Sequence, residues 1–129
     1  MRELFSRAAG PEARATAEQQ ERGRWVLKLR EHIIQARLPL AGVASGMQHP
    51  ESAWEGVGHG LRARTLRRRV KDWERAARYI QIAFGCTWPK EIGMMLDYVQ
   101  TLRESGAPFS AIQSGVFALA LMERAGGVE

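Results

Sequence analysis

The sequence predicts an all-α protein, a compact bundle of about four helices with a long loop after the first helix. Three observations support this fold class. Apolar residues recur at helical spacing in four segments, and no stretch alternates apolar and polar residues as a half-buried strand would. Glycine or proline follows each of these segments, as expected at helix ends. The length of 129 residues fits a single domain.

The composition indicates an intracellular globular protein. Hydrophobic residues make up 45% of the chain and charged residues 26%, which is ordinary for a soluble domain. The single cysteine, Cys86, excludes an internal disulfide and a zinc site built from several thiolates, and it fits a reducing compartment. No apolar run suits a membrane span or a secretory signal. We therefore expect a nuclear or nucleoid-associated protein that is not secreted and has no membrane partner.

The first helix is predicted to begin near Pro11 and to end at Leu38. Proline suits the first position of a helix, where its missing N–H is not needed. The residue before a proline is disfavoured in helical conformation, so Pro39 should end the helix. Its inner face is predicted from apolar side chains at helical spacing: Val26, Leu29, Ile33 and Ala36.

Glycine content divides the N-terminal half further. Gly23 is expected to interrupt the first helix, which leaves residues 1–22 as a polar segment prone to fraying and residues 23–129 as the helical domain. Residues 39–63 contain five glycines and two prolines and are predicted to form a long loop. Trp54 is expected to anchor part of this loop to the core.

The second helix has the clearest pattern. Thr65 is predicted as its N-cap, because a threonine hydroxyl can accept a hydrogen bond from a free backbone N–H. Gly85 is predicted as the residue that ends it in left-handed conformation. One apolar stripe runs along the helix in steps of four and three: Leu66, Val70, Trp73, Ala77, Ile80 and Phe84.

Two further helices complete the predicted bundle. The third should begin at Pro89 or Lys90 and stop at Gly106. Its predicted inner face consists of Ile92, Met95, Leu96, Val99 and Leu102. The fourth should be capped by Ser110 and end at Gly126. Its predicted inner face consists of Ile112, Val116, Leu119 and Met122.

Positive charge is concentrated in one segment. The chain has a formal net charge of +5, and the stretch from Arg62 to Arg78 alone carries seven arginines, one lysine, one aspartate and one glutamate. This segment therefore sums to +6 and the rest of the chain to −1. A localised basic patch is the expected footprint of a polyanionic partner, most often nucleic acid.

The cations of the second helix are predicted to lie opposite its apolar stripe. Arg68 follows Leu66 by two residues, which places it about 200° around the helix. The predicted contacts to double-stranded DNA are Arg62, Arg64, Arg67, Arg68, Lys71, Arg75 and Arg78. A solvated basic face, a membrane surface and an acidic protein remain alternative explanations of the same stripe.

Gln113 and Ser114 are a second, weaker candidate for DNA contact. Both are predicted on the polar side of the fourth helix, where a glutamine can pair with the edge of an adenine. The alternative is an ordinary exposed polar pair.

The remaining polar features do not form a recognisable catalytic or metal motif. His49 and His59 lie in the long loop without the spacing of a zinc site, and the glycines of residues 55–60 lack the preceding strand of a nucleotide-binding loop. We predict no catalytic residue, no metal and no cofactor. A small enzyme that uses these histidines or Cys86 is a further hypothesis.

From the second helix onward, the chain resembles the N-terminal core-binding domain of tyrosine recombinases of the phage-integrase type. The resemblance covers residues 62–128. Arg69 stands where the family often has an aromatic residue, and Arg124 is a lone basic residue where the family usually has several in its final helix. The matching motifs are Arg64-Thr65-Leu66, Lys71-Asp72-Trp73, Tyr79-Ile80, the leucine-rich face from Met94 to Leu102, Ser110-Ala111-Ile112, Ala118-Leu119 and the closing Ala125-Gly126-Gly127-Val128.

The resemblance implies a DNA-binding module in recombination and integration. Such a domain covers one face of a duplex while a separate catalytic domain covers the other, so the implied partners are duplex DNA, a catalytic domain and a second recombinase protomer. The resemblance implies no strand cleavage by this chain alone. The alternative is a helical protein–protein interaction adaptor that uses the helix from Trp25 to Leu38 and the glycine-rich loop.

Overall fold

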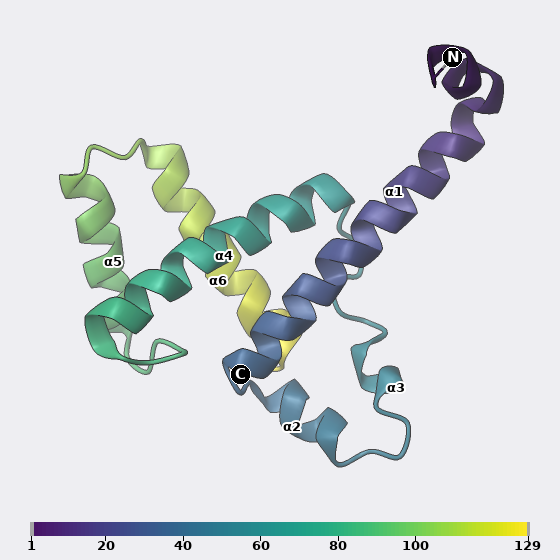
Figure 1. The fold of residues 1–129 in the computed structure, drawn as a ribbon. Coiled ribbons are helices and arrows are strands. Elements are labelled where there is room, and N and C mark those ends of the chain that lie inside the picture. Colours follow the sequence, from purple (N-terminus) through teal and green to yellow (C-terminus); the bar gives the residue numbers. More distant parts are fainter. Residues whose placement is uncertain (1, 129) are drawn as a thin grey trace.

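The structure, a computed structural model, describes residues 2–128, with side chains described from Gly10 onward. The chain forms six helices, and there is no strand within residues 2–128 (Figure 1). The all-α prediction is confirmed, whereas the predicted number of four helices is wrong. The helices are α1 (Arg2–Gln35), α2 (Pro39–Ser45), α3 (Glu51–Trp54), α4 (Ala63–Phe84), α5 (Ile92–Glu104) and α6 (Phe109–Gly126).

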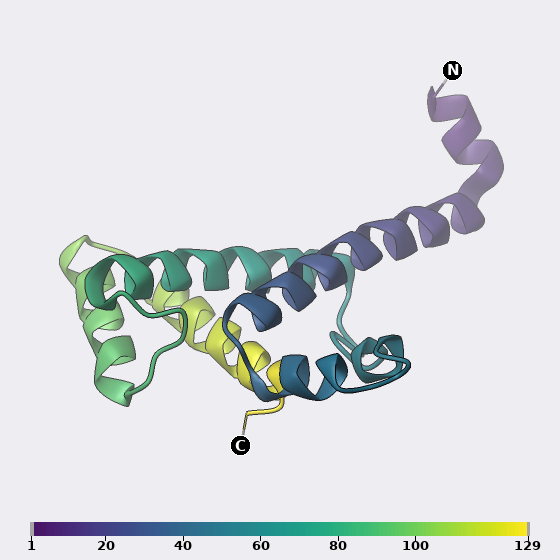
Figure 2. The same ribbon diagram turned by 60° about the horizontal axis from the view of Figure 1, so that its bottom comes forward.

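The long helix α4 organises the molecule. It packs against both α1 and α6, while α5 lies beside the C-terminal end of α4 (Figures 1 and 2). The short helix α2 lies near the C-terminal ends of α1 and α6, and α3 packs against α2. The first part of α1 projects away from this body (Figure 2). Within residues 2–128, no helix is both long and apolar enough to span a lipid bilayer.

Helix α1 bends once and then runs uninterrupted to its end. Gly10 has non-helical dihedral angles, with φ of 50°, and Pro11 begins the segment that carries the buried face. Gly23 does not interrupt the helix, contrary to the sequence-based expectation. The helix ends at Gln35 rather than Leu38, because Arg37 adopts a left-handed φ of 56° and the Leu38 N–H donates to Ile33 O at 3.1 Å.

The predicted loop of residues 39–63 contains two helices. Pro39 does follow the end of α1, but it also occupies the first position of α2, where a proline is favoured. Trp54 ends α3 with its side chain buried, and the Arg30 guanidinium lies 4.9 Å from the centre of its indole ring. The prediction that Trp54 anchors this segment is confirmed.

The N-terminus of α4 is capped from another helix. The prediction that Thr65 caps α4 is wrong, since α4 already begins at Ala63. Arg62, at the cap position, makes no side-chain cap. Instead, Glu18 Oε1 of α1 accepts a hydrogen bond from the Ala63 N–H at 2.9 Å. Sequence reasoning missed this cap because the carboxylate comes from 45 residues away. At the other end, Gly85 has a φ of 67°, as predicted.

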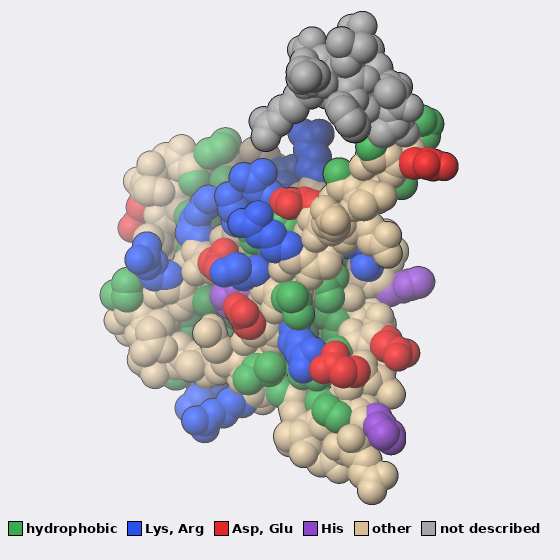
Figure 3. Space-filling model, turned by 45° about the vertical axis from the view of Figure 1, so that its right-hand side comes forward, with side chains coloured by type: hydrophobic (Ala, Val, Ile, Leu, Met, Phe, Trp, Pro, Cys, Tyr) green, Lys and Arg blue, Asp and Glu red, His purple; other side chains and the backbone are tan. Residues whose placement is uncertain are grey.

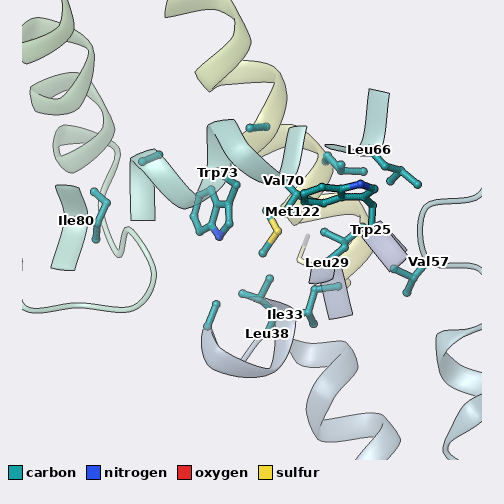
Figure 4. Packing of buried hydrophobic residues seen from close by; sticks show 14 of the residues in the cluster. Trp25, Leu29, Ile33, Leu38, Val57, Leu66, Val70, Trp73, Ile80 and Met122 are labelled. Atoms are coloured by element: carbon teal, nitrogen blue, oxygen red, sulfur yellow. The ribbon is translucent and has the colours of Figure 1, made fainter. Parts of the chain in front are cut away.

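The core lies between α1, α4 and α6 (Figure 4). Leu29 and Ile33 of α1 meet the predicted stripe of α4, of which only Ala77 and Phe84 are not fully buried. Met122 of α6 closes the core from the other side. The largest fully buried side chains are Trp73, Leu29, Ile33, Leu66, Ile80, Met122 and Val70.

Helices α5 and α6 bury different faces from those predicted. Ile92 is 80% exposed, Leu96 59% and Val116 50%. Helix α6 is rotated so that small side chains face α4 and permit a close approach. The residues of α5 and α6 that are buried instead, beside the correctly predicted Met95 and Met122, are Tyr98, Ser114, Gly115, Ala118, Leu121 and Gly126.

The starts of α5 and α6 also differ from the prediction. Helix α5 begins at Ile92 rather than at Pro89 or Lys90, and α6 begins at Phe109 with Pro108, not Ser110, at its cap position. Neither cap residue makes a side-chain hydrogen bond, so the sequence carried no capping signal at the true boundaries.

Candidate nucleic-acid interface

The outward face of α4 forms a row of cations. These residues lie between about 100° and 200° around the helix from Leu66, which points into the core. The amphipathic pattern therefore does what the sequence predicted: burial of the apolar stripe turns the basic stripe to solvent. The exposed members, called the α4 basic face below, are Arg64, Arg67, Arg68, Lys71, Arg75 and Arg78. Arg62, just before the helix, is also exposed.

No carboxylate neutralises this face among the side chains that the structure describes. None of its cations forms an ion pair there. The two acidic residues of α4 are turned away. Glu74 pairs with His32 of α1 at 3.2 Å. Asp72 is half-buried, and its Oδ2 is inaccessible and has no hydrogen-bond partner. Like charges spaced one turn apart repel each other, and a polyanion would relieve that repulsion.

One cation of the face is fixed by a contact with α6. Arg68 Nη2 donates a hydrogen bond to the Ser114 hydroxyl at 3.0 Å, and Ser114 is only 6% exposed. The expectation that Gln113 and Ser114 both lie on the polar side of their helix is therefore wrong for Ser114, whereas Gln113 is exposed. Ser114 holds Arg68 in place and is not accessible for reading a base.

Arg69 belongs to a different environment from the rest of the segment. Its guanidinium lies 4.8 Å from the centre of the Phe117 ring of α6, and the residue is half-buried. A stacked guanidinium of this kind joins the two helices.

Helix α1 adds a cation that sequence reasoning missed. The Trp25 ring lies under two cationic groups, with Arg24 Cζ at 5.8 Å and Lys71 Nζ at 6.0 Å from its centre. Arg24 thereby lies beside the α4 basic face across the junction between the two helices, although it is also paired with Glu21 at 3.9 Å. Figure 3 shows Lys and Arg side chains gathered in one region of the surface, with a few acidic side chains beside them. In the sequence, Arg24 is recognisable only as a cation next to Trp25, and this pattern alone does not predict that Arg24 lies beside the cations of α4.

Arg78, at the end of the face, borders a cavity between α1 and α4. The cavity has a volume of about 330 Å³, and the paired His32 and Glu74 side chains also line it. Cys86 lines the same cavity, with its Sγ 3.4 Å from Phe84 O.

The loop histidines and Cys86, which the hypothesis of a small enzyme named as alternatives, lie apart in the structure. His49 and His59 are both exposed in the segment between α2 and α4 and do not line the cavity that holds Cys86. Within the described part of the chain, no group of three or more His, Cys, Asp or Glu side chains is placed to hold a metal ion.

Comparisons of the chain with protein-family models, with curated proteins and with solved structures found no match.

Proposed function

We propose that this chain is a DNA-binding module that grips a duplex through the α4 basic face and has no catalytic activity of its own. The observation that carries the proposal is the row of six exposed cations on one side of a single helix, without an ion pair among the described residues. Each phosphate that such a row neutralises releases counterions, which favours binding.

The geometry of a helix suits a duplex. The cations of the α4 basic face extend from Arg64 to Arg78, about 21 Å along the helix axis, so they can contact several phosphates of a duplex. Arg64, Arg67, Lys71, Arg75 and Arg78 are assigned to phosphates, with one or two of them reaching a guanine edge. Arg68, held by Ser114, takes a fixed phosphate contact.

The resemblance to the core-binding domain of tyrosine recombinases extends this proposal to recombination and integration. In that context a catalytic domain or a second recombinase protomer would complete the clamp around the duplex. For the adaptor alternative, Trp25, Leu29 and Ile33 of the helix assigned to partner binding are buried in the core, whereas Leu27 and Ile34 of the same helix are exposed.

The test is a titration of a labelled duplex of about 30 base pairs at low and physiological salt, followed by fluorescence anisotropy. We expect binding that weakens steeply with salt. The double substitution Lys71→Ala with Arg75→Ala should weaken binding to all sequences and reduce the slope of log K against log salt by roughly 0.9 for each lost phosphate contact.

The matched control removes the same charge elsewhere. Lys90→Ala with Arg124→Ala also deletes one lysine and one arginine, both exposed and both outside α4. We expect this pair to leave the slope nearly unchanged. Absence of binding at low salt would overturn the proposal, and an equal loss in both double variants would contradict the assignment to α4.

A further inference from the structure

Helix α5 presents an apolar stripe to solvent. Ile92 and Leu96 are exposed and Val99 is half-buried, and their spacing of four and three residues places all three on one side of the helix. This side differs from the one that buries Met95 and Tyr98 against the body. We call Ile92, Leu96 and Val99 the α5 stripe.

Helix α6 continues the apolar surface. Ile92 of the α5 stripe and Leu119 of α6 line the same cavity of about 270 Å³, together with Met95 and Val128. Val116, one turn before Leu119, is 50% exposed. We call this cavity, together with the α5 stripe and Val116, the α5–α6 groove.

A surface of this kind favours association. Burial of one large aliphatic side chain contributes about 1.5–3 kcal/mol, and contiguous exposed apolar patches on soluble proteins often mark contact sites. Ile92, Leu96 and Val99 have the four-and-three spacing of apolar residues on a helix face that packs against another helix. Among the described residues α5 packs on α4 and α6, and Ile92 and Leu96 stay exposed beside those contacts, so the stripe is open to a partner.

The charges around the groove indicate which partner fits. Lys90, Glu91 and Glu123 line the cavity at the N-terminal end of α5. Two carboxylates and one ammonium group give these three residues a net charge of −1. Arg103 follows Val99 by four residues and so lies at the opposite end of the α5 stripe. None of these charges forms an ion pair among the side chains in residues 10–128. On the side of the stripe, one end of the groove is therefore acidic and the other carries Arg103, whereas the neighbouring Glu104 lies about 100° further around the helix.

We propose that a second copy of this chain covers the α5–α6 groove, with the two α5 helices antiparallel across a twofold axis. In this arrangement Arg103 of each copy meets Glu91 and Glu123 of the other, and the two α5 stripes bury each other. A parallel arrangement would place like charges together. The twofold axis repeats each favourable contact, as expected for a surface that is complementary to itself.

The pairing uses the α5 stripe and none of the residues of the α4 basic face, which is exposed in the single chain even though Arg68 donates to Ser114 of α6. The inference does not depend on DNA binding. Its test therefore needs no DNA, and its failure would leave the proposed function untouched.

The first experiment measures the mass of the full chain by sedimentation over a concentration series. We expect the native chain to approach twice the mass of one copy as its concentration rises, and Ile92→Glu to remain a single copy. The matched control is Ile82→Glu on α4: Ile82 is 78% exposed, close to the 80% of Ile92, but lies outside the groove. Circular dichroism of each variant checks that it folds.

The second experiment exchanges charges to test the geometry. Arg103→Glu alone, and Glu91→Arg with Glu123→Arg in another chain, should each weaken self-association by placing like charges together. A mixture of the two variants should associate again, because both ends of the mixed pair regain opposite charges. A native chain that stays monomeric at every concentration would overturn the proposal. An Ile82→Glu variant that dissociates like Ile92→Glu would also overturn it, and so would a mixture of the two charge variants that does not associate.

Discussion

At the scale of single residues, the close contact between the end of α6 and Leu38 requires a glycine at position 126. Gly126, the last residue of α6, is buried, and a Cβ atom there would lie 2.9 Å from the Cβ of Leu38. Leu38, the residue that precedes α2, has a buried side chain. Contact at this distance leaves no room for a methyl group unless the backbone moves.

We expect Gly126→Ala to lower the free energy of unfolding by about 1–3 kcal/mol, because the added carbon must displace Leu38. Gly93→Ala is the matched control, since a Cβ at this exposed position of α5 would meet nothing within 4 Å. That change should be neutral or stabilise by up to about 1 kcal/mol through helix propensity. Urea unfolding of both variants makes the comparison, and equal effects would contradict the close packing described here.

A second residue-scale expectation concerns Tyr98. Burial raises the pKa of its phenol above the ordinary value of 10.0, the charge of Arg75 lowers it, and that of Asp72 raises it. Below this ordinary value the phenol is protonated in both the folded and the unfolded chain. Above it the unfolded chain releases the proton first, so the contribution of Tyr98 to stability is present at lower pH and is lost as the pH rises above about 10.

We expect Tyr98→Phe to remove this part of the pH dependence while keeping the packed ring. The measurement is the free energy of unfolding of both proteins at pH values below and above the ordinary tyrosine pKa. Between those two conditions the native chain should lose more stability than the variant. Identical losses would show that the Tyr98 phenol ionises as readily in the folded chain as in the unfolded one.

At the scale of elements, contacts from α1 fix the beginning of α4. Besides the Glu18 cap, Arg22 holds the segment before α4 by donating to Leu61 O at 2.8 Å and to Gly58 O at 2.7 Å. A carboxylate at a helix N-terminus also interacts favourably with the helix dipole. Two residues of α1, Glu18 and Arg22, therefore position the N-terminal turn of α4, which carries Arg64 and Arg67.

We expect Glu18→Ala to destabilise the protein by about 1 kcal/mol, the usual cost of a lost N-cap. The change should also speed hydrogen exchange of the Ala63 amide, which donates to this carboxylate. Glu12→Ala removes the same charge from an exposed position of the same helix and is the control. If both variants exchange the Ala63 amide at the native rate, the hydrogen bond does not protect it in solution.

At the scale of the whole molecule, two surfaces with different chemistry have no residue in common. The α4 basic face suits a polyanion, and the α5–α6 groove suits an apolar partner. The groove explains why the sequence pattern of α5 and α6 predicted the wrong buried faces for these two helices. Ile92, Leu96 and Val116 do have helical spacing, but they follow an apolar surface that the single chain leaves open. Periodicity identifies an apolar face without saying whether the same chain covers it.

The sequence by itself determined the helical class, the existence of the long amphipathic helix that ends before Gly85 and the direction of its basic face. Those features follow from local periodicity, which fixes the opposite faces of a helix once one is buried. Only the tertiary structure decided that residues 39–63 contain helices, that Glu18 caps α4, that Ser114 is buried beneath Arg68 and that Arg24 lies beside the basic face. The physical reason is that these outcomes depend on contacts between residues far apart in the chain, which local patterns do not encode.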